Sequence, residues 1–209
     1  MSECSLKETI YQSIWQGIVN GEYDSNYVFN EKALVAKFNV SKSPVRDALI
    51  ELCSDGILRS IPRFGYEIVK ITNKELQEII RLRTLIEVDN LSNIVGRVSD
   101  DKIQALHDFI AETDVKIASG DLSIQDHWQN NILFHKKLYS LSNNNFGEKL
   151  LDRCLKAETI AYSTYLLYTV DTNNILNSIA HQNIINYIAS KDLESACKAL
   201  SDDLKAVTI

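Results

Sequence analysis

The stretch V-S-K-S-P-V-R-D-A-L, from Val40 to Leu49, decides the fold of the N-terminal part of this chain. Ser43 followed by Pro44 marks the start of a helix, because proline is tolerated in a helix's first turn. Apolar side chains follow at the spacing of one helix face: Val45, Ala48, Leu49 and Leu52. Gly56 ends this helix. The pattern predicts a short amphipathic helix with a polar N-terminus.

The segments on either side predict short elements joined by turns. Helical spacing occurs upstream at Ile10, Ile14, Ile18 and Val19, and again over Glu31–Phe38. Downstream, two strand-like runs at Ile57–Ile61 and Tyr66–Val69 are joined by the turn P-R-F-G. Three helices followed by a hairpin predict a winged helix-turn-helix over residues 1–72.

The rest of the chain, residues 73–209, predicts an antiparallel all-helical bundle, so the protein is expected to be mostly α. Both prolines and four of the seven glycines lie in the first third, which leaves long uninterrupted segments afterwards. The expected helices span 73–95, 99–118, 124–142, 145–167, 173–189 and 191–207. In the first of these, four residues are expected to line one apolar face: Ile79, Leu82, Leu85 and Ile86.

Composition restricts the class of protein. The 209 residues are 45% hydrophobic, which is enough for a buried core. No apolar stretch reaches about 18 residues and no secretory signal precedes the first helix, so we expect a cytoplasmic protein with no membrane partner. The net charge is −6, yet residues 32–70 carry seven cations against four carboxylates. A local basic patch is compatible with DNA binding.

The beginning of the 40–49 helix carries residues suited to nucleic acid. In a helix-turn-helix, the second helix enters the major groove with its N-terminal residues toward base edges and phosphates. Ser41, Lys42 and Ser43 suit phosphate oxygens, and Arg46 can hold guanine O6 and N7 together. Taken alone, the same residues also fit an ordinary capped helix with a charged surface.

This segment resembles the recognition helix of the GntR family of bacterial regulators. Further family features surround it: I-V-N-G-E-Y at 18–23, E-K-A-L-V-A-K-F at 31–38, L-x-x-L-C-S-D-G-I-L at 49–58 and P-R-F-G-Y at 62–66. The resemblance implies DNA contacts at seven residues: Lys32, Ser41, Lys42, Ser43, Arg46, Arg63 and Gly65. Lys32 and Lys42 stand where arginine is common, and lysine reads guanine less rigidly.

The second part resembles the all-helical sensing (FCD-type) domain of the FadR-like subgroup. The resemblance rests on R-L-R-T-L-I-E at 81–87, on Phe134-His135, and on the tail that begins at His181. Many members hold a divalent metal with an Asp, a His four residues later and two further His. The corresponding residues here are Asn131, His135, His181 and Asp203. Two imidazoles and a carboxylate can hold zinc, nickel, manganese or iron.

Alternatives to that metal site remain open from the sequence. Asn131 replaces the Asp of that pattern and Asp203 replaces its last His. These replacements also fit a site that holds the ligand directly, or two unrelated histidines. Arg81 and Arg83 are candidates for binding a ligand carboxylate, because a buried guanidinium can fork onto it. A structural ion pair across the bundle, involving Glu87, is equally compatible with this segment.

These observations predict a ligand-responsive transcription regulator rather than an enzyme. We expect a repressor that binds double-stranded operator DNA as a homodimer and responds to a small-molecule effector, with a carboxylate favoured. Two alternatives stay open: a DNA-binding dimer without a small ligand, and a metal-dependent enzyme. The sequence carries no nucleophile motif or phosphate loop in favour of the enzyme.

Overall fold

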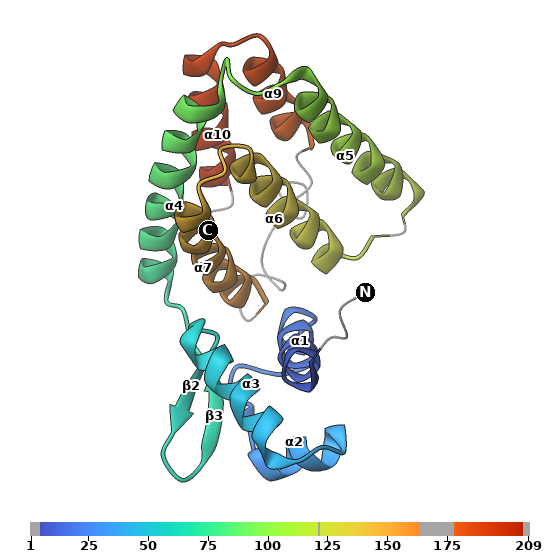
Figure 1. Cartoon of the computed structure of the whole chain (residues 1–209), viewed down its shortest axis with the longest axis vertical. Helices are drawn as coiled ribbons and strands as arrows, with labels where there is room; N and C mark the ends of the chain where they lie inside the picture. Colours follow the sequence, from blue (N-terminus) through green and yellow to red (C-terminus); the bar gives the residue numbers. More distant parts are fainter. Residues whose placement is uncertain (1–4, 121, 164–177, 207–209) are drawn as a thin grey trace. The chain divides into compact units, whose positions relative to one another are not determined.

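The computed structural model describes residues 5–120, 122–163 and 178–206 (Figure 1). The chain divides into two compact units, which are described separately below. The first contains residues 1–76 together with 156–168, and the second contains 77–155 together with 169–209. The domain boundary expected at residues 72 and 73 stays a prediction.

Three helices form most of the first unit. Their bounds are α1 Leu6–Val19, α2 Glu31–Phe38 and α3 Lys42–Ser54. The Asn30 side chain caps α2 by accepting a hydrogen bond from the backbone of Lys32, and Asn39 ends α2 in the left-handed region at φ 50°. This left-handed residue turns the chain between α2 and α3, as a helix-turn-helix requires.

The wing is a three-stranded antiparallel sheet of order β1-β3-β2. Its strands are β1 Val28–Phe29, β2 Leu58–Ile61 and β3 Gly65–Ile68. The β2–β3 hairpin follows the expected runs, and Leu58 pairs with Ile68. Strand β1 was not predicted, because two residues are too few to show a period of two.

The core of the first unit lies between α1, α3 and the sheet. The apolar face predicted for α3 is fully buried, with Val45, Ala48, Leu49 and Leu52 each at 0% exposure. Leu34 of α2 and Phe29 of β1 join the same cluster. Ile160, from the end of α7, also belongs to it. The winged helix-turn-helix is therefore held by the residues whose spacing predicted it.

The second unit is a helical bundle. Its helices are α4 Asn73–Ile94, α5 Asp100–Ser119, α6 Ile124–Ser140, α7 Asn145–Ala161, α9 Ser178–Ala189 and α10 Leu193–Ala206. They follow the expected spans, apart from parts of the spans 145–167, 173–189 and 191–207 that lie outside the described residues. Among the described helices, none combines the length and apolar character needed to cross a bilayer.

Local capping explains where several of these helices begin and end. Ser123 and Asp126 form a reciprocal capping box at the start of α6. Gly120 follows α5 at φ 73°, a left-handed conformation that glycine adopts without steric cost. Asn144 accepts a hydrogen bond from the Gly147 backbone at the start of α7. Residues at the helix ends therefore determine where α5 ends and where α6 and α7 begin.

The buried face of α4 differs from the expected one. Leu82 is 52% exposed and Leu85 is 69% exposed, so the apolar face predicted through these residues points away from the core. The buried face carries three polar residues, Arg83, Glu87 and Asn90, each at 1–3% exposure, between the buried apolar residues Leu76, Ile80, Leu91 and Ile94. Helical spacing identified the helix correctly but assigned its faces wrongly, because the bundle encloses a polar cluster on this side.

Candidate functional site

The N-terminal end of α3 presents the polar residues that the sequence singled out. Ser41 is the N-cap of α3, and its side chain makes no cap hydrogen bond. Lys42, Ser43 and Arg46 follow on the exposed face, opposite the buried Val45. Four of the predicted DNA contacts therefore share one exposed helix end, where unpaired backbone N–H groups favour anions.

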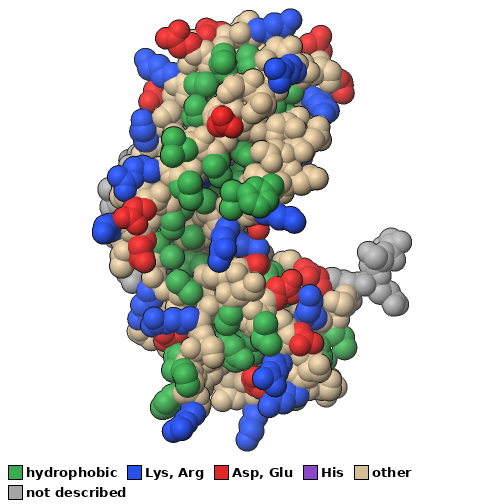
Figure 2. All heavy atoms as spheres, turned by 60° about the vertical axis from the view of Figure 1, so that its left-hand side comes forward, with side chains coloured by type: hydrophobic (Ala, Val, Ile, Leu, Met, Phe, Trp, Pro, Cys, Tyr) green, Lys and Arg blue, Asp and Glu red, His purple; other side chains and the backbone are tan. Residues whose placement is uncertain are grey.

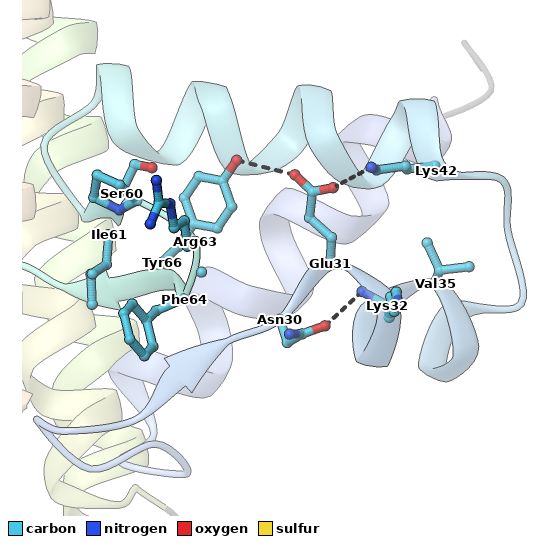
Figure 3. A pocket seen from close by; sticks show the side chains of 12 residues that line it. Asn30, Glu31, Lys32, Val35, Lys42, Ser60, Ile61, Arg63, Phe64 and Tyr66 are labelled. Carbon is cyan, nitrogen blue, oxygen red and sulfur yellow. Dashed lines mark hydrogen bonds and ion pairs between the residues drawn. The ribbon is translucent and has the colours of Figure 1, made fainter.

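A groove of about 600 Å³ lies between α2, the start of α3 and the wing (Figure 3). Three of its lining residues are the cations Lys32, Lys42 and Arg63. They come from α2, α3 and the β2–β3 turn, three segments separated in sequence. Folding therefore brings them to one concave surface, and a groove lined by cations suits a DNA backbone.

The turn of the wing shapes one side of this groove. Arg63 adopts φ 71° and Gly65 adopts φ 137°, both in the region that favours glycine. A Cβ atom on Gly65 would run into the backbone carbonyl of Phe29, so any side chain there would displace β1. Phe64 at the tip is 72% exposed. Gly65 thus has a structural reason to be glycine, and its DNA contact stays a prediction.

Sequence reasoning missed the acidic residue of the groove, Glu31. Its Oε2 atom lies 3.1 Å from the Nζ atom of Lys42, and its Oε1 atom accepts a 3.3 Å hydrogen bond from the Tyr66 hydroxyl (Figure 3). Burial and the charge of Glu31 raise the pKa of Tyr66, while the charge of Arg46 opposes that rise. The signal in the sequence was an acid in the first turn of α2, directly before Lys32.

The second unit contains a buried cluster of possible metal ligands. It consists of His135 from α6, His181 from α9 and Asp203 from α10, and their ligating atoms lie within 4.8 Å of one another. The Oδ2 atom of Asp203 is 3.3 Å from Nε2 of His135 and 3.6 Å from Nε2 of His181. Asn131, one turn before His135 on α6, is buried as well. All four predicted ligand positions are therefore interior.

The cluster leaves polar atoms unsatisfied. Within the described residues, Oδ1 of Asn131, Nε2 of His181 and Oδ2 of Asp203 are buried and lack a hydrogen bond of acceptable geometry. Buried polar atoms without partners are costly. A tetrahedral zinc ion with N and O ligands at roughly 2.0–2.1 Å would place its ligand atoms about 3.3 Å apart. The donor set and its spacing therefore fit a divalent ion.

Side chains behind the cluster orient the imidazole of His135. The Nδ1 atom of His135 lies 2.8 Å from Oε2 of Glu87, and Oε1 of Glu87 lies 2.5 Å from Nε of Arg83. The Phe134 ring stacks on His181 with centroids 3.8 Å apart. A carboxylate on one ring nitrogen fixes the tautomer and leaves the other nitrogen for a ligand.

The charges of this cluster depend on one another. Burial opposes ionisation of Glu87, but Arg83 and His135 outweigh it and hold the pKa of Glu87 below its usual value. Likewise, burial works against ionisation of Asp203, yet His135 and His181 keep the pKa of its carboxyl well below its usual range. Burial lowers the pKa of His181. Both buried carboxyls therefore have lowered pKa values, and the pKa of His181 is lowered as well.

The two arginines predicted to bind a ligand carboxylate lie in different environments. Arg83 is buried and pairs with Glu87 one turn later on α4, and Glu87 in turn contacts His135 of α6. Arg81 is exposed on the outer face of the same helix and does not join the cluster. Consecutive turns of one helix explain the Arg83–Glu87 pair, since residues i and i+4 share a face.

A winged helix-turn-helix with a cationic groove, joined to a helical domain, defines a DNA-binding transcription regulator. The chain belongs to the GntR family of bacterial regulatory proteins and carries an FCD domain. Residues 6–68 match the model described as bacterial regulatory proteins of the gntR family, and residues 78–206 match that of the FCD domain. The expected fold class and family are thereby confirmed.

Relatives of known name are regulators too. The chain is 27% identical over 186 residues to the uncharacterized HTH-type transcriptional regulator YdhC of Bacillus subtilis (strain 168), covering 89% of this chain and 82% of that protein. It is 29% identical over 141 residues to the gluconate operon transcriptional repressor of the same organism, covering 66% of this chain and 56% of the repressor. The family and these relatives point away from an enzyme.

Solved structures share the fold. Escherichia coli McbR/YncC superposes with a TM-score of 0.80 at 19% identity, covering 96% of this chain and 94% of that one. A putative GntR regulator from Rhodococcus sp. RHA1 superposes with a TM-score of 0.77, also at 19% identity, covering 95% and 93%. At this identity the likeness establishes the architecture.

Proposed function

We propose that this regulator is a repressor whose operator binding is modulated by a small organic acid, held at a divalent metal in the second unit. The observation that carries the proposal is the convergence of His135, His181 and Asp203 from three helices on one buried point. A buried donor set in a domain attached to a DNA-binding unit would suit it to act as a sensor.

The residues have separate parts in this proposal. His135 and His181 would hold the ion through Nε2 and Asp203 through a carboxylate oxygen, with the Asn131 amide oxygen as a neutral fourth donor. Glu87 keeps His135 oriented for that role. The ion, when bound, would supply residual positive charge and open coordination positions suited to a carboxylate. Zinc, nickel and manganese are the metals we propose.

DNA binding is proposed to involve seven residues that meet the groove or the end of α3. They are Lys32, Ser41, Lys42, Ser43, Arg46, Arg63 and Gly65. The support is that all of them except the half-buried Gly65 are exposed, and that Lys32, Lys42, Arg63 and Gly65 line the groove (Figure 3). One such unit covers a single half-site, so we propose a homodimer on an inverted repeat.

The dimer is proposed to form through the outer face of α4 and α7. Helix α4 exposes Leu82 and Leu85, and helix α7 exposes Phe146 and Leu150. Ile86 of α4 packs with Leu151 and Leu155 of α7, which makes the two helices neighbours. Apolar side chains are visible along the surface over α4 in Figure 2.

The charges beside this face are self-complementary. If α4 packs antiparallel on a second copy about a two-fold axis near Leu85, Arg81 of one copy lies opposite Asp89 of the other, because each is four residues from Leu85. Both residues are exposed. A two-fold interface requires such self-complementarity. In this proposal, Arg81 serves assembly rather than binding of the effector.

Elemental analysis of protein purified without chelator tests the metal proposal. We expect about one divalent ion per chain in the wild type and none in His135→Ala, which should retain basal DNA binding. His107→Ala is the matched control, since this histidine of α5 lies outside the cluster. If the wild type holds no metal, and added zinc, nickel or manganese changes neither Tm nor DNA affinity, the metal proposal is wrong.

A further inference from the structure

We propose that Glu31 is a specificity-determining residue of the DNA interface, which tethers Lys42 and keeps non-specific phosphate contacts out of the groove. The proposal rests on the DNA-facing role of this groove and adds a function for its acidic residue. A carboxylate in a DNA interface opposes binding to phosphate. Its presence is explained if it improves discrimination between DNA sequences, and the contacts of Glu31 show how it would do so.

Glu31 connects three elements through one side chain. It is the first residue of α2, where the helix N-terminus favours a negative charge. One carboxylate oxygen lies 3.1 Å from Lys42 of α3, and the other accepts the Tyr66 hydroxyl of β3 at 3.3 Å. Because each oxygen has its own partner on a different element, the carboxylate is held in a fixed orientation (Figure 3).

The two partners of the Lys42–Glu31 ion pair differ in how far they are exposed to solvent. The Lys42 side chain is 70% exposed and the Glu31 side chain is 24% exposed. Lys42 therefore stands at the rim of the groove, and Glu31 lies deeper in it. Among the described residues that line the groove, Glu31 is the single acid, beside Lys32, Lys42 and Arg63. A phosphate that enters toward Lys42 also approaches the carboxylate.

This arrangement affects the two kinds of DNA binding differently. Non-specific binding depends on flexible cations that reach whatever phosphate is near and release counterions. A tethered Lys42 contributes less to it, because its charge is partly compensated by Glu31. In the complex with a specific DNA sequence, the contact with Glu31 instead directs the remaining N–H donors of Lys42 in one direction. Specificity is a difference of affinities, so weakening the non-specific complex increases it.

The variant Glu31→Gln tests the proposal because it removes the charge and keeps the shape. Binding is measured on a random-sequence 30-base-pair duplex and on a duplex that the wild-type protein enriches from a randomised library. On the random duplex, affinity should rise about two- to fivefold, the range expected for one exposed ion pair. The slope of log K against log salt should steepen by about 0.9, as for one more neutralised phosphate. The ratio between enriched and random duplexes should fall.

Two further variants separate this role from a structural one. In Lys42→Ala protein, adding Glu31→Gln should no longer steepen the salt slope, because the tethered cation is gone. Tyr66→Phe removes the hydroxyl contact without changing charge and should leave the slope unchanged. Thermal melts accompany each variant.

The proposal is overturned if Glu31→Gln leaves the salt slope unchanged, or lowers affinity for both duplexes equally along with Tm. Equal steepening with and without Lys42 also overturns it. If Lys42→Ala alone changes neither affinity nor slope, the DNA-facing assignment of the groove fails instead, and the two failures are thereby distinguished.

Discussion

The carboxylate of Glu87 lies 2.8 Å from Nδ1 of His135, which turns the other ring nitrogen, Nε2, toward Asp203. Glu87 is itself held by Arg83, one turn earlier on α4. A buried ion pair on one helix thus sets the orientation of an imidazole on another. Positioning of this kind is typical of histidines that bind metal.

Glu87→Gln should therefore weaken metal binding by about 10- to 100-fold, the usual effect of losing a partner of a ligating histidine. It should also lower the free energy of unfolding, since Arg83 keeps its charge in a buried position. Titration of apo protein with zinc measures the first effect and a thermal melt in chelator the second. Glu112→Gln, at an exposed position of α5, is the control. A lower Tm with unchanged zinc affinity would leave Glu87 a purely structural role.

Asn131→Asp should change stability in opposite directions with and without metal. In chelator, a second buried carboxylate near Asp203 repels it and should lower Tm. With zinc or manganese in excess, the same carboxylate adds a charged ligand, so Tm and metal affinity should both exceed those of the wild type. Asn130→Asp makes the same charge change one residue away on α6. If metal does not reverse the sign, residue 131 faces no ion.

Arg46→Ala should weaken operator binding by about 1–3 kcal/mol and relax the base preference at one position of each half-site, if Arg46 reads guanine. Selection from a randomised library with wild-type and variant protein measures both effects. Lys70→Ala is the control, because Lys70 belongs to the same unit but contacts Asn26 away from the groove. Wild-type selectivity in Arg46→Ala would show that α3 does not read bases through this residue.

Leu85→Asp should convert the protein to a monomer. The substitution places a charge at the centre of the exposed apolar face of α4, where the proposed two-fold axis passes, and burying two such charges is unfavourable. Light scattering at micromolar concentration should show half the wild-type mass, and affinity for the inverted repeat should fall. Val115→Asp on α5 is the matched control, since Val115 is 70% exposed and Leu85 is 69%. A dimer in Leu85→Asp would place the interface elsewhere.

Much of the first unit could be predicted from the sequence because its signals are local. The spacing of Val45, Ala48 and Leu49 identified both the α3 helix and its buried face. Asn39 and the wing turn are equally local, since each depends on the conformations that a few residues can adopt. The long helices of the second unit were predicted for the same reason, because uninterrupted helical spacing and caps extend over many residues.

Local signals did not determine which face of α4 is buried. Leu82 and Leu85 predicted an apolar inner face, whereas the bundle buries Arg83, Glu87 and Asn90. A buried charge is tolerated when other charges and hydrogen bonds compensate it, and for Glu87 one of those partners comes from another helix. Glu87 meets His135, 48 residues away in sequence, a separation at which spacing carries no information.

The sequence by itself determined the winged helix-turn-helix, the long helices and the polar residues at the start of α3, since neighbouring residues impose these features. The tertiary structure alone decided that His135, His181 and Asp203 share one buried point, and that Glu31 contacts Lys42 and Tyr66. Long-range contacts of this kind depend on how helices and strands pack against one another. Packing is a property of the whole fold, so no single segment contains it.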